Sequence, residues 1–254
     1  MRTEFSRKKI GVALGGGAAL GAAHIGILNA LEDLDIEIQC IAGTSVGAVV
    51  SIFYAFGVPL DEIKHLALRL KWSDTLRFNL SKMGLLSNER LGRMVQGRLG
   101  NCCLQDAPLP LAIVATDIEH AEKVVITEGD IKSAIMASTC VPGVFEPVER
   151  NGRVLVDGGL LENVPLSPLC DMGAEFRIGV DLIAKHGNYS RPHHMIDVII
   201  NAIEMAIKYS TRIQTQAADL LICPDLSDFM ITNTRRTDQL IQRGYEAARL
   251  AFTG

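Results

Sequence analysis

The segment Gly43-Thr44-Ser45-Val46-Gly47 has the G-x-S-x-G pattern of a nucleophilic serine. An apolar stretch that predicts a strand precedes it, and one that predicts a helix follows it. The flanking glycines let the backbone make a tight turn there without side-chain clashes. The N–H groups and dipole of the following helix favour negative charge beside the serine. The pattern predicts an acyl-transfer site with Ser45 as nucleophile, and a purely structural turn is the alternative.

A serine hydroxyl needs a proton acceptor to become a strong nucleophile, and three aspartates follow apolar strands. They are Asp117, Asp157 and Asp181. Asp157 differs from the others because Gly158 and Gly159 follow it, and a D-G-G turn lets a carboxylate approach another loop closely. This context favours Asp157 as the acid of the site, although a capping or turn role is an alternative for each aspartate.

Histidine is the usual base in such sites, so the residues leave a second possibility open. The triad order of an α/β-hydrolase, serine then acid then histidine, would select among His186, His193 and His194. None of the three has a distinctive neighbourhood. His24, early in the first predicted helix, is better explained by packing or by a hydrogen bond at the helix end. Because adjacent residues point in different directions, His193 and His194 do not predict a metal site, and we expect no cofactor.

A glycine-rich turn precedes the first predicted helix, within the sequence ALGGGAALGAAHIG at residues 13–26. Such turns bring backbone N–H groups close to negative groups. The dinucleotide pattern is not met, because Ala18 interrupts it and the next strand ends in the serine turn, and the lysine of a phosphate-binding loop is missing. Binding of a nucleotide is therefore the weaker alternative. We predict an oxyanion hole formed by the N–H groups of Gly15, Gly16, Gly17 and Ala18.

Strand-like and helix-like segments alternate along almost the whole chain, which predicts an α/β fold. Because the strands are continuous runs of Val, Ile, Leu and Ala, we expect a mainly parallel sheet with helices on both faces. Reactive groups collect at the carboxyl ends of strands in such sheets. The strands are expected at residues 9–14, 36–42, 110–116, 123–127, 153–156, 176–182 and 219–223. The helices are expected from the glycine turn to Leu34, from the serine turn to Phe56, and at 195–217 and 235–252.

The chain resembles the patatin-like phospholipase family in the order of three motifs. They are the glycine-rich turn, G-x-S-x-G on the second strand, and D-G-G far downstream. The resemblance extends beyond the motifs and covers about residues 8–250. It implies a three-layer α/β/α fold, formed as one domain over 8–250 after a short extension at 1–7. The segments that carry it are ALGGGAALGAAHIGIL, IAGTSVGAVV, ATD, ITEGDIKSAIMASTCVPGVFEPV, RVLVDGGLLENVP, DLLICPDL and QLIQRGYEAA.

The resemblance also implies a catalytic dyad in place of a triad. Ser45 would accept the acyl group and Asp157 would act directly as its general base, so that histidine is not needed. The N–H groups of the glycine-rich loop would hold the oxyanion, and water would release the fatty acid. Members of the family hydrolyse lipid acyl esters, and the bacterial and plant types need no metal. A lipid or fatty-acyl ester is accordingly the expected substrate.

Two residues of the glycine-rich loop depart from the family pattern, and Ala18 is the milder change because its backbone N–H is kept. The family usually has Arg or Lys before the last glycine of G-x-G-x-x-G, whereas here Leu20 precedes Gly21. Loss of a donor from an oxyanion hole costs on the order of a hundredfold in rate. From Leu20 we expect a weak esterase or one that prefers neutral esters to phospholipids. The alternative is a regulatory or binding protein with the patatin fold and little or no turnover.

Composition excludes some partners and points to a compartment. The net charge of −4 and the shortness of the basic clusters at 7–9 and 235–236 argue against nucleic acid as a partner. Six cysteines without C-x-x-C pairing predict reduced thiols in the cytoplasm, and no apolar run approaches the ~20 residues of a membrane span. The segment WSDTLRFNLSKMGLL at 72–86 predicts either core packing or a transient contact with a membrane surface. The oligomeric state is left open.

Overall fold

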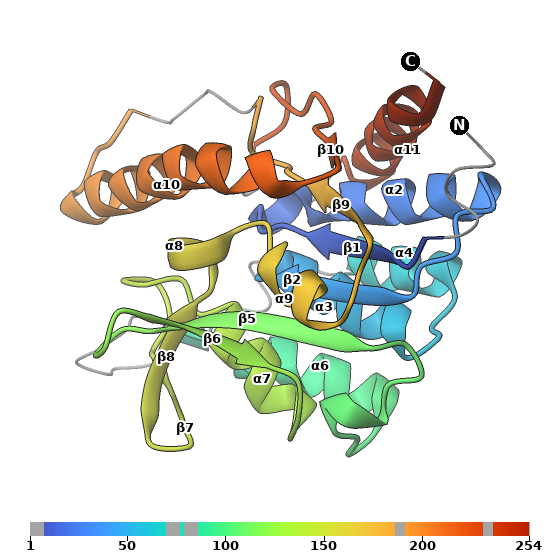
Figure 1. The fold of residues 1–254 in the computed structure, drawn as a ribbon. Coiled ribbons are helices and arrows are strands. Elements are labelled where there is room, and N and C mark those ends of the chain that lie inside the picture. The colour runs from blue at the N-terminus through green and yellow to red at the C-terminus, as the bar shows by residue number, and fades with distance from the viewer. Residues whose placement is uncertain (1–7, 70–76, 79–85, 186–190, 231–235, 254) are drawn as a thin grey trace.

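An eight-stranded sheet runs through the molecule in the order β10-β9-β1-β2-β5-β8-β7, with β6 beside β5 (Figure 1). The computed structural model describes residues 8–69, 77–78, 86–185, 191–230 and 236–253. The strands of this sheet are β1 (Ile10–Leu14), β2 (Cys40–Thr44), β5 (Leu111–Asp117), β6 (Glu122–Ile126), β7 (Val148–Arg150), β8 (Arg153–Asp157), β9 (Phe176–Val180) and β10 (Leu220–Ile222). A separate two-stranded sheet pairs β3 (Arg77–Phe78) with β4 (Leu86–Ser87).

Helices cover both faces of the large sheet, as the apolar strands require. The α-helices are α2 (Ala22–Asp33), α3 (Val46–Ala55), α4 (Leu60–Arg69), α6 (Glu89–Leu99), α7 (Ile131–Ser138), α8 (Gly159–Glu162), α9 (Ser167–Asp171), α10 (Met195–Gln214) and α11 (Thr237–Thr253). Short 3₁₀ turns form η1 (Ala18–Gly21), η2 (Leu104–Asp106) and η3 (Thr215–Ala217). None of the helices described is long and apolar enough to cross a membrane.

The alternation of side chains along the central strands divides the core into two layers. Val12 and Leu14 of β1 face the larger cluster, which includes α2, α3, α7 and α11. Ala13 between them faces a smaller cluster with Val164 and Leu169, at the side of the sheet where α8 and α9 lie. Small residues on this second face let short helices approach the sheet. The predicted three-layer α/β/α fold is confirmed.

The sheet is parallel at its centre and antiparallel at one edge. The pairs β10–β9, β9–β1, β1–β2 and β2–β5 are parallel, which agrees with the prediction of a mainly parallel sheet. In contrast, β6 and β8 both run antiparallel to β5, and β7 and β8 form a hairpin. The predicted single domain over 8–250 stays a prediction.

Two expected elements differ from those observed. The strand expected at 36–42 begins only at Cys40. A turn with Asp35 at φ 57° follows α2, and pairing with β1 starts at Cys40. The helix expected directly after the glycine turn starts as the 3₁₀ turn η1. The segment at 72–86 lies outside the described residues except for β3 and Leu86, so its two interpretations stay predictions.

Candidate active site

Ser45 and Asp157 lie close together because β2 runs parallel to β5, β8 runs antiparallel to it, and the two strands end at neighbouring residues of β5. Thr44, the last residue of parallel strand β2, pairs with Val114 of β5. Asp157, the last residue of antiparallel strand β8, pairs with Ala115, the next residue along β5. Successive residues of a strand are only about 3.3 Å apart along its axis. The strand ends therefore bring two residues distant in sequence to one point.

The backbone at Ser45 occupies a conformation that few residues with side chains adopt, with φ 55° and ψ −125°. Its N–H donates to Ser138 Oγ (2.9 Å), and that hydroxyl donates to the carbonyl of Val114 (2.7 Å). A Cβ at Gly47 would lie 2.1 Å from the carbonyl oxygen of Leu14, so only glycine fits there. Strained backbone of this kind persists only where surrounding contacts hold it, and it projects the serine from the end of the sheet.

Asp157 is buried and lines the same pocket as Ser45, which is where the predicted dyad requires the base. Only 6% of its surface is exposed, and the Ser45 hydroxyl lies close enough to its carboxylate to lower its pKa. The N–H of Gly159 donates to Asp157 Oδ1 (2.8 Å). Burial raises the pKa of Asp157 to about 6, and the interactions with Ser45 and Gly159 oppose this rise. The carboxylate is thus ionised at neutral pH yet far more basic than an exposed aspartate.

Only two of the four predicted oxyanion donors are available. The N–H of Gly15 donates to a backbone carbonyl of β9 (3.1 Å), and that of Gly16 donates to both Asn163 O (3.3 Å) and Asn163 Oδ1 (3.2 Å). Within the described residues, the N–H groups of Gly17 and Ala18 have no acceptor. Gly15 and Gly16 therefore anchor the loop, and the oxyanion prediction narrows to Gly17 and Ala18.

His24 and Leu20 support the loop from within the core. His24 Nε2 donates to the carbonyl of Gly15 (2.7 Å), and burial lowers the pKa of the ring to about 4, so His24 is neutral. This agrees with a packing role and not a catalytic one. Leu20 is fully buried and does not line the pocket beside Ser45. The expectation of weak turnover or of a preference for neutral esters stays a prediction.

An apolar pocket of about 130 Å³ opens beside the two catalytic candidates. Gly17, Ala18, Ser45, Asp157 and Asn163 line its reactive end. Its walls include Val141, Leu160, Ile200, Ile203 and Ile207, and the polar residues Glu204 and Lys208 of α10 complete them. None of the histidines that the structure describes lines this pocket.

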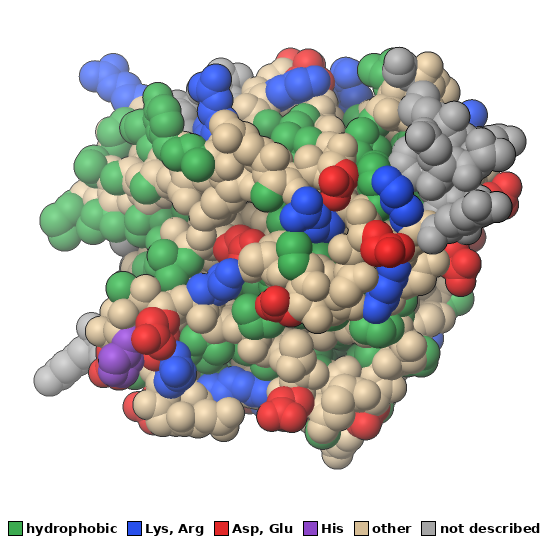
Figure 2. All heavy atoms as spheres, in the orientation of Figure 1, with side chains coloured by type: hydrophobic (Ala, Val, Ile, Leu, Met, Phe, Trp, Pro, Cys, Tyr) green, Lys and Arg blue, Asp and Glu red, His purple; other side chains and the backbone are tan. Residues whose placement is uncertain are grey.

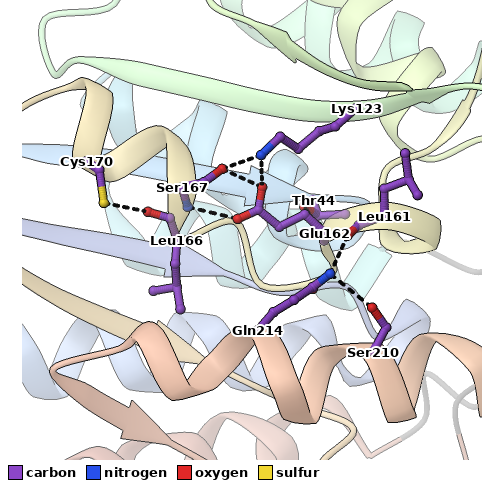
Figure 3. Close-up of polar contacts among 9 residues, drawn as sticks. All are labelled: Thr44, Lys123, Leu161, Glu162, Leu166, Ser167, Cys170, Ser210 and Gln214. Carbon is purple, nitrogen blue, oxygen red and sulfur yellow. Dashed lines mark hydrogen bonds and ion pairs between the residues drawn. The ribbon is translucent and has the colours of Figure 1, made fainter. Parts of the chain in front are cut away.

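A buried carboxylate fixes the turn that follows Asp157 (Figure 3). Glu162, at the end of α8, accepts from Lys123 Nζ (2.8 Å) and from the N–H and hydroxyl of Ser167 (2.8 and 2.7 Å). The Thr44 hydroxyl donates to the Glu162 carbonyl (2.9 Å). Gln214 of α10 donates to the backbone carbonyl just before Glu162. Since Thr44 precedes the nucleophile, this network joins the serine turn to the helix that follows the acid.

Asn163 is the residue of this site that the sequence analysis missed. It lies six positions after Asp157, inside the segment RVLVDGGLLENVP. Its side chain reaches the glycine-rich loop and lines the pocket. The only sequence signal was its closeness to the D-G-G turn, which does not tell a pocket residue from an ordinary helix-end asparagine.

The other two strand-end aspartates lie away from Ser45. Asp117 accepts hydrogen bonds from His120 Nδ1 (3.0 Å) and Arg153 (3.3 Å). Asp117, Glu119 and His120 offer ligand atoms within 4.8 Å of one another, but the Arg153 guanidinium already balances the charge of the buried aspartate. Asp181 accepts from the N–H of Ile183 (2.9 Å) and lines a neighbouring pocket.

Comparison with known proteins gives a consistent set of relatives. The family model described as patatin-like phospholipase matches residues 12–169. An uncharacterised NTE family protein of Mycobacterium tuberculosis is 38% identical over 180 residues, which are 70% of this chain and 50% of that protein. Lysophospholipase NTE1 of Yarrowia lipolytica is 31% identical over 184 residues, 70% of this chain and 13% of that protein. The chain spans about half the length of the mycobacterial relatives.

Two solved structures share the fold. VipD from Legionella pneumophila superposes with a TM-score of 0.69 at 14% identity, covering 96% of this chain and 66% of that one. The type III effector protein ExoU superposes with a TM-score of 0.55 at 13% identity, covering 96% of this chain and 52% of that one.

Proposed function

The chain belongs to the patatin-like phospholipase family, and we propose that it is a serine acyl hydrolase that cleaves carboxylic ester bonds of lipids through Ser45 and Asp157. The position of Ser45 beside a buried carboxylate of raised pKa, at the end of one apolar pocket, carries this proposal. A serine with such an acceptor can lose its proton as it attacks. A lysophospholipase among the relatives supports the lipid class of the substrate. The cytoplasmic location stays a prediction.

The proposed reaction has two steps. Ser45 Oγ attacks the ester carbonyl carbon while its proton passes to Asp157, and the carbonyl oxygen takes up the negative charge beside the N–H groups of Gly17 and Ala18. The tetrahedral intermediate collapses to an acyl-serine, and the alcohol leaves with the proton from Asp157. Water then attacks the acyl-serine, gives a proton to Asp157, and the fatty acid is released as that proton returns to Ser45 Oγ.

The outer face of α10 supports delivery of the substrate from a lipid surface. Hydrophobic side chains gather over this helix (Figure 2). Its large exposed apolar residues are Met195, Val198, Ile199, Met205, Tyr209 and Ile213. Ile200, Ile203 and Ile207 on the opposite side of the same helix line the pocket. A helix is about 10 Å across, so a lipid touching the outer face lies close to the catalytic serine.

The proposal is tested with a fluorophosphonate probe and a panel of acyl esters. We expect the wild type to be labelled and to hydrolyse the esters, and expect both activities to be lost in Ser45→Ala. Ser51→Ala is the matched control, because Ser51 is a buried serine of α3 that does not line the pocket. Labelling that persists in Ser45→Ala would refute Ser45 as the nucleophile. A folded wild type that neither reacts with the probe nor hydrolyses the esters would refute the proposed hydrolase activity.

The main alternative, a regulatory or binding protein with weak or no turnover, rests chiefly on the missing basic side chain at Leu20. Leu20 is buried and does not line the pocket, and the alternative stays a prediction. The two functions differ in one observable: a regulator leaves the wild type unlabelled by the probe although its fold is intact.

A further inference from the structure

Asn163 fills the space between the glycine-rich loop and the D-G-G turn. A Cβ added at Gly16 would lie 2.7 Å from Asn163 Oδ1 and 3.3 Å from Ser45 Cβ. One added at Gly159 would lie 3.1 Å from Asp157 Oδ1 and 3.3 Å from Asn163 Oδ1. The side-chain amide of Asn163 is therefore close to both Ser45 and Asp157, and it occupies space that the missing side chains of Gly16 and Gly159 leave free.

The orientation of this amide is set by the loop. The N–H of Gly16 donates to Asn163 Oδ1 (3.2 Å), so the oxygen points at the loop and Nδ2 forms the other arm. Asn163 is only 4% exposed, and its Nδ2 is buried without an acceptor within the described residues. A buried donor left unpaired costs about 1–3 kcal/mol. Asn163 lines the pocket, but its Nδ2 has almost no accessible surface in the free protein, so a bound substrate supplies the missing acceptor as the amide shifts toward it.

We propose that Asn163 Nδ2 donates a hydrogen bond to the carbonyl oxygen of the bound ester and strengthens that bond as the oxygen becomes an oxyanion. This inference rests on the proposed function, and it adds a side-chain donor to the backbone N–H groups of Gly17 and Ala18. An amide suits this task because it does not titrate and so donates at every pH at which Asp157 is ionised. No proton is transferred to or from Asn163 in the step.

Two variants isolate the donor. Asn163→Asp keeps an acceptor for the Gly16 N–H but removes the donor, whereas Asn163→Leu has a similar shape and removes both. The two variants share only the loss of the donor. With a short-chain ester we expect kcat to fall about a hundredfold in each, with KM changed by less than about threefold. We also expect affinity for an alkylboronic acid, whose serine adduct is tetrahedral, to fall in parallel with kcat/KM.

Asn88→Leu is the matched control. Asn88 is another buried asparagine, 3% exposed, whose Nδ2 donates to the Met136 carbonyl (2.7 Å) and to Thr139 Oγ1 (2.9 Å), and it does not line the pocket. Its removal is expected to lower the melting temperature and to leave kcat and boronic acid affinity within about threefold of the wild type.

The outcomes separate this inference from the proposed function. If the wild type hydrolyses the ester but both Asn163 variants retain kcat and boronic acid affinity, the donor role is overturned and the dyad stands. If Asn163→Leu does not fold, Asn163→Ala takes its place, because it also removes the donor and, unlike Asn163→Asp, adds no negative charge beside Asp157. A folded wild type that neither hydrolyses the ester nor reacts with a fluorophosphonate overturns both proposals together.

Discussion

At the scale of single residues, the protonation of Asp157 governs the proposed chemistry. Its carboxylate is nearly closed off from water, and this burial raises its pKa to about 6. The proposed base must be ionised to accept the Ser45 proton. The same burial that makes the carboxylate a better base therefore places its titration close to physiological pH.

We expect kcat/KM for a substrate that does not titrate to be flat above the Asp157 pKa of about 6. Below it, kcat/KM should fall about tenfold per pH unit as the base of the free enzyme takes up a proton. The measurement is a pH–rate profile with a neutral short-chain ester, and retention of the fold at each pH is checked by circular dichroism. A profile that stays flat down to pH 4.5, with the fold intact, would contradict Asp157 as the base.

The same pKa shift makes Asp157 a cost to stability. Its pKa is 3.8 in the reference state and about 6 in the fold, so the folded state binds the proton more tightly and loses stability as pH rises through this window. Asp157→Asn, which keeps an oxygen for the Gly159 N–H, should therefore be inactive but more stable at pH 7, by up to about 3 kcal/mol. The advantage should vanish near pH 4, where the wild-type carboxyl is protonated in the fold.

Urea unfolding of both proteins at the two pH values measures this difference. Asp61→Asn is the control, because Asp61 is an exposed residue in the first turn of α4 and does not line the pocket. Its substitution should produce no comparable gain at pH 7. Equal stability of Asp157→Asn and the wild type at both pH values would show that burial of the carboxylate is not the dominant effect.

At the scale of elements, two glycines let α2 and α11 cross with their backbones in contact. A Cβ at Gly26 of α2 would lie 1.8 Å from the carbonyl oxygen of Ile241, and one at Gly244 of α11 would lie 2.0 Å from that of Ala23. Both distances are far below van der Waals contact, and the clashing atoms belong to backbone that cannot rotate away. The helix that carries His24 beneath the glycine-rich loop is thus held by this crossing.

Gly26→Ala should separate the two helices and lower the free energy of unfolding by about 2–3 kcal/mol. Gly97→Ala is the control, because Gly97 lies in α6 with nothing within 4 Å of an added Cβ. The control should gain about 0.5–1 kcal/mol from the better helix propensity of alanine. Thermal and urea unfolding measure both effects, and a Gly26→Ala protein as stable as the wild type would rule out the close crossing.

At the scale of the whole molecule, α10 connects the surface with the active site. One side of the helix lines the pocket, and the other exposes a stripe of large apolar side chains. Exposed apolar surface that continues into a ligand pocket is the arrangement expected of a protein that takes its substrate from an interface. Arg212 is also exposed on this helix and suits an anionic lipid surface.

Ile213→Gln should weaken binding to vesicles of phosphatidylcholine with phosphatidylglycerol by about tenfold, because one large side chain no longer enters the apolar layer. Leu250→Gln is the matched control: Leu250 of α11 is 72% exposed, close to the 71% of Ile213, but is not part of α10. Vesicle sedimentation measures binding, and hydrolysis of a soluble ester should be unchanged in both. An equal loss of vesicle binding in both variants, or a wild type that does not sediment with vesicles, would contradict this contact.

The sequence by itself determined the local parts of this protein. The runs of Val, Ile and Ala identified the central strands, because a strand buried on both faces has no polar positions. The G-x-S-x-G turn and the D-G-G turn were recognisable because tight turns restrict residue type locally, where glycine is needed for backbone reasons. The nucleophile prediction and the resemblance to the family followed from these short segments.

Only the tertiary structure decided which of these parts act together. Asp117, Asp157 and Asp181 all follow apolar strands. The D-G-G turn and the family resemblance favoured Asp157, but only strand order and direction place it opposite Ala115, beside the end of β2. Long-range hydrogen bonds likewise engage the N–H groups of Gly15 and Gly16, whereas the Nδ2 of Asn163 has no acceptor among the residues that the structure describes. Leu20 is buried because the 3₁₀ turn η1 directs its side chain into the core. Such facts arise from contacts between segments far apart in the chain, so no local pattern of residue types encodes them.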